Sequence, residues 1–139
     1  RVRASSAIHS VLAASLAGEF PRRLDRAPLL VPGEDSAVRA PLLRWLRTAN
    51  IHPRVVGEFD DRALMKAFGQ AGAGVFVVPA VIASEVETQN GVVVVGSTEA
   101  VRERYFLITV ERRISHPAAR VVTEAARSGL FTAEPPPGR

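Results

Sequence analysis

The sequence contains no cysteine, and it has only three histidines and a single lysine among its 139 residues. Without cysteine the chain has no disulfide framework, no thiolate metal site and no cysteine nucleophile. Three scattered histidines are too few for a zinc site of the usual kind. No apolar run approaches the roughly 20 residues that a membrane helix needs. Residues 1–17 lack the pattern of a signal peptide, because His9 and Ser10 interrupt the apolar stretch. We therefore predict a cytoplasmic protein.

The composition is that of a folded domain. Hydrophobic residues make up 47% of the chain and charged residues 23%, which is enough apolar surface to form a core. A length of 139 residues fits one ordinary domain. Since the first residue is arginine and not methionine, we expect a piece of a longer protein.

The positive charge comes almost entirely from arginine. The formal net charge is +4 at pH 7, and Lys66 is the only lysine. The arginines are spread along the sequence, and a dispersed charge gives no focused field. Aromatic residues do not alternate with them as they do in proteins that bind single-stranded nucleic acids. We therefore predict a solvated surface with ion pairs and not a nucleic-acid-binding patch.

Apolar runs and amphipathic stretches alternate along the chain. Short aliphatic runs predict strands at residues 29–31, 54–59, 75–78, 92–95 and 105–111. Apolar residues at helical spacing, preceded by the possible caps Asp35 or Ser36 and Asp60 or Asp61, predict helices at residues 36–49, 61–70, 80–89 and 117–130. The Asn90-Gly91 pair predicts the end of the third helix. Residues 132–139 are rich in proline and predict a disordered tail.

The apolar patterns also predict which faces are buried. The run Val92–Val95 is typical of a strand that is buried on both faces. The residues expected on the buried sides of the second and fourth helices are Leu64, Ala67, Phe68, Val121, Val122, Ala125 and Ala126.

Strand–helix–strand units of this length are typical of a parallel sheet. The sequence therefore predicts the α/β class, with an open, mostly parallel sheet and helices on both faces. Ligands of such proteins bind beyond the carboxyl ends of the strands.

Acidic residues follow two of the predicted strands. Gly33-Glu34-Asp35-Ser36 comes after the first strand, and Glu58-Phe59-Asp60-Asp61 comes after the second. One interpretation is helix capping, because such side chains satisfy free N–H groups and the helix dipole. The other is a cation site, because hard cations take several oxygen ligands. The same acids argue against an anionic ligand at these helix N-termini.

No arrangement of residues predicts catalysis. The sequence has no G-x-S-x-G motif, and none of its histidines stands in the context of a catalytic triad. The turn Gly72-Ala73-Gly74 precedes a strand and lacks the spacing of a nucleotide-binding loop. We expect no enzyme activity, no catalytic residue and no cofactor.

Several segments occur together in an order found in a known family. They are Leu29–Pro32, Arg54–Phe59, Ala67–Pro79 and a closing strand at Tyr105–Arg113 with a helix that starts at Pro117. In these segments the chain resembles the effector-binding domain of LysR-type transcriptional regulators. The stretch AGAGVFVVP looks like that family's glycine-turn-strand-proline signature. GEFDDRALMKAFGQAGAGVF and EAVRERYFLITVERR are most similar to the family's sodium-responsive branch, which activates expression of a sodium/proton antiporter.

The resemblance implies an effector module like a periplasmic binding protein. Residues 1–15 would be a strand or crossover of a partial first subdomain, and residues 16–100 would be the second effector subdomain. Residues 101–131 would be the last strand and helix, which return to the first subdomain. The family's N-terminal winged helix-turn-helix is absent from this sequence.

The resemblance also implies roles for the two acidic loops, since the family's effectors sit between the subdomains. By motif position, the effector-binding residues are Gly33, Glu34, Asp35, Ser36, Glu58, Phe59, Asp60 and Asp61. A sodium or lithium ion as effector would bind Glu34, Asp35, Asp60 and Asp61. The parent protein would be a homo-oligomer, a tetramer in this family. It would bind promoter DNA only through the absent domain and affect RNA polymerase indirectly, with no membrane partner.

Two other interpretations stay open. A solute-binding protein of similar two-lobed architecture would need a secretion signal, which the sequence does not show. A truncated remnant with no activity of its own would expose apolar faces of the last strand and helix.

Overall fold

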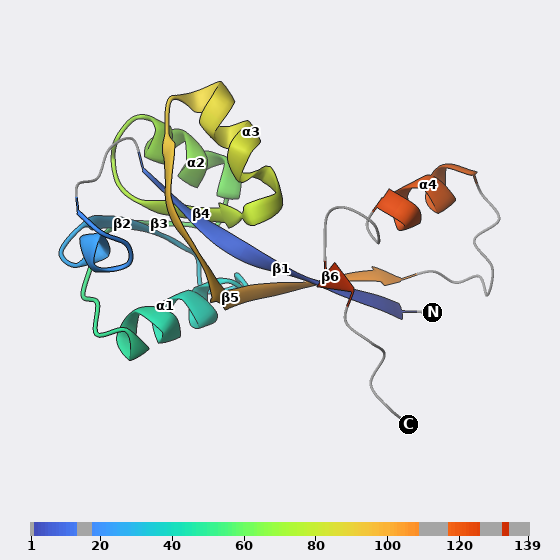
Figure 1. The fold of residues 1–139 in the computed structure, drawn as a ribbon, viewed down its shortest axis with the longest axis horizontal. Coiled ribbons are helices and arrows are strands. Elements are labelled where there is room, and N and C mark those ends of the chain that lie inside the picture. Colours follow the sequence, from blue (N-terminus) through green and yellow to red (C-terminus); the bar gives the residue numbers. More distant parts are fainter. Residues whose placement is uncertain (1, 14–17, 109–116, 126–131, 134–139) are drawn as a thin grey trace. The chain divides into compact units, whose positions relative to one another are not determined.

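The computed structural model of the chain describes residues 2–13, 18–108, 117–125 and 132–133 (Figure 1). Its contacts divide into two compact units. The larger unit is Ile8–Arg102, and the smaller unit combines Arg1–Ala7 with Glu103–Arg139. The strands β1 (Val2–Ala13) and β5 (Val93–Ile108) each contribute residues to both units. The subdomain boundaries drawn from the family resemblance stay predictions.

The larger unit is built on two adjoining strand pairings. β2 (Pro28–Pro32) pairs with β3 (Arg54–Phe59) in parallel, as the sequence predicted. On its other side β2 joins Val75 through a parallel bridge, with Leu30 N–H donating to the Val75 carbonyl at 2.8 Å. β4 (Phe76–Pro79) continues from Val75 and pairs with β1 in antiparallel fashion. β5 also pairs with β1. Because β4 and β1 run in opposite directions, the sheet contains both strand directions.

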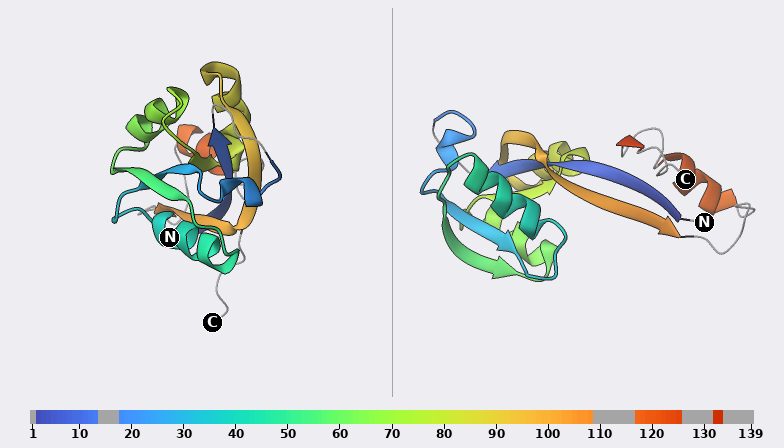
Figure 2. Two further views of the ribbon diagram at one scale, coloured as in Figure 1. Left: turned by 90° about the vertical axis from the view of Figure 1, so that its left-hand side faces the viewer. Right: turned by 90° about the horizontal axis from the view of Figure 1, so that it is seen from below.

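Helices cover both faces of these strands, as predicted (Figure 2). α1 (Arg39–Thr48) buries Leu42 and Leu46 against one face. α2 (Arg62–Gln70) and α3 (Ala80–Asn90) contribute to a second core on the other face, which contains Leu30 and the fully buried Phe76. A short 3₁₀ helix, η1 (Arg22–Leu24), lies in the connection between β1 and β2. The α/β class is therefore confirmed.

The helix boundaries agree with the predicted signals except at the start of α1. α3 ends before Gly91, which has φ 63°, as the Asn-Gly pair indicated. The prediction that α1 starts at residue 36 was wrong, because Ser36 N–H closes a turn onto the Gly33 carbonyl at 3.0 Å and the helix begins at Arg39. Pro41 then falls within the first turn, where its missing N–H removes no helical hydrogen bond.

α2 turns a different face to the core from the one the pattern predicted. Met65 and Gly69 are buried, whereas Leu64 and Phe68 are 49% and 48% exposed, and Ala67 is exposed as well. The reason is the ring of Phe76. A Cβ at residue 69 would lie 2.1 Å from Phe76 Cδ1, so only glycine lets the helix approach that ring. The buried face of α2 is therefore the one that carries Gly69, and the pattern of apolar residues alone does not identify that face.

The predicted strands at 92–95 and 105–111 were wrong as two separate elements. β5 is a single strand of 16 residues, and its polar middle is held by its place beside β1. The run Val92–Val95 is not buried on both faces, since Val92 and Val95 are buried and Val93 is 48% exposed. Residues 109–111 lie outside the described part of the chain.

The smaller unit holds α4 (Pro117–Ala125) and β6 (Thr132–Ala133). β6 pairs with β1, with Ser6 opposite Thr132, so the predicted disorder was wrong for these two residues. The predicted burial of Val121, Val122 and Ala125 was also wrong, because no described element covers that helix face and all three side chains are exposed. Ala126, the predicted helix end 126–130 and the tail 134–139 lie outside the described residues.

Among the described residues, no helix has the length and apolar character needed to cross a membrane.

Candidate functional site

The two acidic loops meet because their strands are parallel neighbours. Pro32 of β2 lies opposite Phe59 of β3, so both strands end at the same edge of the sheet. Gly33 N–H donates to the Phe59 carbonyl at 2.7 Å, which ties the first loop to the second. The structure therefore brings together residues 33–36 and 58–61, which we call the carboxyl edge.

Close contact between the loops depends on Gly33. A Cβ at this position would lie 1.9 Å from Asp60 Oδ1 and 3.3 Å from Asp60 Cα. The Asp60 side chain occupies the space that any larger residue would need. Gly33 is buried and Asp60 is exposed, so the contact holds the carboxylate at the surface of the edge.

Arg39 is the cation of the carboxyl edge, and sequence reasoning missed it. Its guanidinium donates to the Pro32 carbonyl at 2.8 Å and pairs with Glu58 Oε1 at 2.9 Å. A positive charge in the first turn of α1 opposes the helix dipole, and Glu58 offsets that cost. No local pattern could reveal this pair, because Arg39 and Glu58 are distant in sequence and only the β2–β3 register brings them together.

Several predicted site residues have structural roles. Asp61 caps α2, since its Oδ1 accepts hydrogen bonds from the N–H groups of Ala63 at 2.7 Å and Leu64 at 3.3 Å. The ring of Phe59 packs against Phe68 at 5.2 Å between centroids. Ser36 Oγ accepts a long bond of 3.4 Å from Val38 N–H, ahead of a helix start that has no side-chain cap. For Asp61, the capping interpretation describes its contacts.

The other carboxylates of the carboxyl edge stay available. Glu34, Asp35 and Asp60 are exposed, and their side chains have no ion pair or hydrogen bond within the described ranges. No three acidic or histidine side chains in those ranges gather closely enough to hold a metal ion. The edge thus presents separate carboxylates that attract a cation, and backbone oxygens or water would have to complete its coordination.

Comparison with known proteins gives the family. Residues 6–130, which are most of the chain, match the model described as LysR substrate binding domain. The chain belongs to the LysR family. It is 39% identical over 113 residues to the transcriptional activator protein NhaR of Escherichia coli K12, and the match covers 81% of the chain and 38% of NhaR.

Solved structures of the LysR fold agree with this assignment. The regulatory domain of Synechocystis CcmR in complex with 2-PG has a TM-score of 0.62 and 13% identity, with 90% of this chain and 65% of that chain covered. Vibrio fischeri DarR in complex with DNA has a TM-score of 0.61 and 15% identity, with 90% of this chain and 44% of that chain covered. At these identities the likeness shows the fold, which is that of a LysR effector-binding domain.

The family confirms two predictions. A LysR domain of this kind is the effector-binding part of a transcriptional regulator, and such a regulator is a transcription factor and not an enzyme. The family match also favours the regulator over the solute-binding protein. The chain spans less than half the length of NhaR.

Proposed function

We propose that this LysR domain senses sodium or lithium ions, and that its parent regulator activates expression of a sodium/proton antiporter in response. The acidic carboxyl edge is the observation that carries the proposal, because two loops from separate segments present three unpaired carboxylates at one edge. The resemblance to the sodium-responsive branch and the 39% identity to NhaR support it.

The proposed ion ligands are Glu34, Asp35 and Asp60, with Asp61 as a further oxygen donor. One oxygen of Asp61 accepts the hydrogen bonds that cap α2, and Glu58 is paired with Arg39. These two carboxylates therefore contribute less to ion binding. Gly33, Ser36 and Phe59 complete the effector-binding surface. Gly33 N–H ties the two loops together through the Phe59 carbonyl, and Ser36 N–H closes the turn of the first loop onto the Gly33 carbonyl.

The parent regulator would act in the cytoplasm as a homo-oligomer. It would bind promoter DNA through a winged helix-turn-helix outside this chain and affect RNA polymerase indirectly. An ion changes such a system only if it binds one conformational state more tightly than the other. The carboxyl edge must therefore bind the ion more tightly in one conformational state of the regulator than in the other.

A thermal melt of this chain tests the proposal. The midpoint is measured at matched ionic strength in the chlorides of sodium, lithium, potassium and choline. An ion that binds the folded state raises the midpoint by linkage, so sodium and lithium should raise it above the value in potassium or choline. The triple variant Glu34→Gln, Asp35→Asn, Asp60→Asn should lose that difference.

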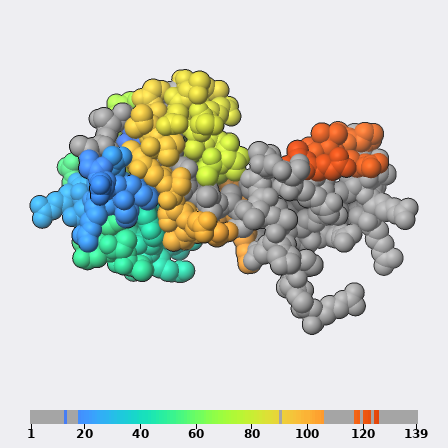
Figure 3. Space-filling view, viewed as in Figure 1, coloured from blue at the N-terminus to red at the C-terminus, as the bar shows by residue number. Residues whose placement is uncertain are grey.

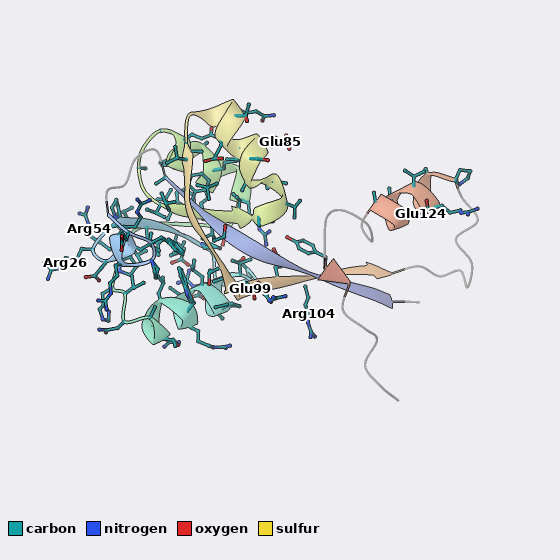
Figure 4. The ribbon with its side chains drawn as sticks, in the orientation of Figure 1. Arg26, Arg54, Glu85, Glu99, Arg104 and Glu124 are labelled. Carbon is teal, nitrogen blue, oxygen red and sulfur yellow. The ribbon has the colours of Figure 1, made fainter. Side chains whose placement is uncertain are left out.

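A matched variant controls for net charge. Glu85→Gln, Glu99→Gln and Glu124→Gln remove the same number of carboxylates from other elements, as Figure 4 shows, and should keep the difference between salts. If the carboxyl-edge variant keeps the sodium and lithium difference, the site assignment is wrong. If the unmodified chain shows no difference, the chain does not bind these ions by itself.

A further inference from the structure

The opposite edge of the same two strands is basic. The amino ends of β2 and β3 meet the η1 connection and the carboxyl end of α1, and five arginines come together there from separate segments. We call this surface the basic edge and define it by Arg22, Arg26, Arg44, Arg47 and Arg54. Figure 4 labels Arg26 and Arg54 at the same end of the ribbon.

Hydrogen bonds hold together the three segments that carry these arginines, which are the η1 connection, the end of α1 and the start of β3. Arg26 N–H donates to the His52 carbonyl at 3.0 Å, and Arg54 N–H donates to the Ala27 carbonyl at 2.8 Å. His52 N–H in turn donates to Asp25 Oδ1 at 2.8 Å. The connection through residue 26 is therefore fixed against the segment that enters β3.

The α1 end of the basic edge is linked to the same point. Asn50 N–H donates to the Arg47 carbonyl at 3.0 Å, and the Asn50 side-chain oxygen lies 3.0 Å from His52 Nε2. Arg44 stands three residues before Arg47, so both lie on one face of the helix. Asp25 N–H donates to the Arg22 carbonyl at 3.0 Å, which links Arg22 to the same segment. All five arginines thus belong to segments joined by hydrogen bonds and not to independent loops.

The charges of the basic edge are largely uncompensated. All five arginine side chains are exposed, and none has an ion pair or side-chain hydrogen bond among the described residues. Glu19 and Asp25 are the carboxylates of the η1 connection, and Asp25 already accepts from His52. In Figure 3 this connection, drawn in blue, projects into solvent at one end of the larger unit.

Arg26 has an unusual backbone conformation. Its φ is 61°, in the left-handed region that disfavours residues with a Cβ and favours glycine. Its side chain has no hydrogen bond or ion pair in the described structure that would offset the cost of this conformation. Strained residues of this kind cluster at binding and switch sites, so the side chain points to a ligand outside this chain.

We propose that the basic edge binds the phosphate backbone of duplex DNA. A guanidinium matches a phosphate through two parallel hydrogen bonds, and arginine supplies every positive charge of the surface. The proposal rests on the proposed DNA-binding role of the parent regulator and is independent of sodium sensing. It would give the parent regulator a second contact with DNA, separate from its DNA-binding domain.

An acidic protein is the competing partner, and the surface fits it less well. Protein interfaces have an apolar centre surrounded by polar residues. Among the described residues, Val55 and Val56 beside Arg54 are the exposed large hydrophobic side chains nearest in sequence to the basic edge, and the others lie at Leu64 or later in the chain. Phosphate contacts need no such centre, because released counterions supply most of the free energy.

Fluorescence anisotropy with this chain and a labelled 30-base-pair duplex of arbitrary sequence tests the proposal. Dissociation constants are measured between about 20 and 150 mM salt, and we expect values of about 10⁻⁴–10⁻⁶ M that weaken steeply with salt. The variant Arg26→Gln, Arg47→Gln, Arg54→Gln should bind about tenfold more weakly or worse. The slope of log K against log salt should become shallower by about 3.

A charge-matched variant and a second polyanion decide between the alternatives. Arg62→Gln, Arg102→Gln and Arg120→Gln remove three arginines from other elements and should leave binding nearly unchanged. Equal losses in the two variants would mean that net charge alone binds DNA, which overturns the proposal. Polyglutamate that binds as tightly as the duplex would overturn it in favour of an acidic protein. The sodium dependence of the melt is measured on the same variants, so that a failure of ion sensing is seen separately.

Discussion

The two edges of the β2–β3 pair carry opposite charges although they are separated only by the length of two short strands. Glu34, Asp35 and Asp60 are free at the carboxyl edge, whereas Arg26 and Arg54 are free at the basic edge. In a parallel arrangement, helices begin at the carboxyl ends of the strands and end at the amino ends. Helix dipoles favour acids at the first location and bases at the second.

The dipole explains only part of this separation. Asp61 caps the start of α2 and Arg47 lies in the last turn of α1, so these two charges stabilise the fold. Glu58 is also engaged, because it pairs with Arg39, whereas Glu34, Asp35 and Asp60 at the carboxyl edge and the other arginines at the basic edge have no ion pair or side-chain hydrogen bond within the described structure. The comparison teaches that the structural charges and the charges available for binding can be separated residue by residue, and three stability measurements examine that separation.

The largest effect is expected from the strand that both edges share. Leu30→Ala in β2 removes a side chain that is 1% exposed and should lower the free energy of unfolding by about 2–5 kcal/mol. Urea unfolding followed by circular dichroism measures the change. Val55→Ala in β3, where the side chain is 53% exposed, is the control and should cost less than about 0.5 kcal/mol. Equal costs would contradict a central position for β2.

A smaller effect separates two neighbouring acids of the carboxyl edge. Asp61→Ala removes the cap of α2 and should cost about 1 kcal/mol, whereas Asp61→Asn should keep most of that stability. Asp60→Ala has no cap to lose and should stay within about 0.5 kcal/mol of the unmodified chain. Chemical unfolding of the three variants measures the differences. The division between structural and free acids fails if Asp60→Ala costs as much as Asp61→Ala.

The smallest effect, and the only gain, is expected at the basic edge. Arg26→Gly relieves the left-handed backbone at φ 61° and should raise the free energy of unfolding by about 0.5 kcal/mol. Arg26→Ala removes the same charge but keeps a Cβ, so it should bring no such gain. Thermal and urea unfolding measure both variants. An equal gain in the two would show that charge repulsion, and not backbone strain, is relieved.

Much of the carboxyl edge could be predicted from the sequence because each of its loops is continuous. Residues 33–36 and 58–61 directly follow apolar strands, and the rule for parallel sheets brings them to one edge. The cap at Asp61, the extent of β3 and the stop at Gly91 are local signals of the same kind. The Arg39–Glu58 pair carries no local signal, because its two members come from different elements.

The basic edge is the opposite case, because the sequence did not predict a basic surface. The arginines are dispersed along the chain, and dispersion predicted a solvated surface with ion pairs. Whether five of them share a surface depends on where α1 ends relative to β3 and on the turn at Arg26. Such a gathering depends on contacts between segments that are distant in sequence, and no pattern within one segment records them.

By itself, the sequence determined the alternation of strands and helices, the α/β class and the acidic loops, because strand runs, caps and turns are set by neighbouring residues. Only the tertiary structure decided which face of α2 is buried, that β5 is one strand and that the arginines converge. Burial depends on the partner that packs against a face, as Phe76 does against Gly69. A polar segment such as the middle of β5 becomes a strand when its position beside another strand supplies the hydrogen bonds that its own residues do not favour.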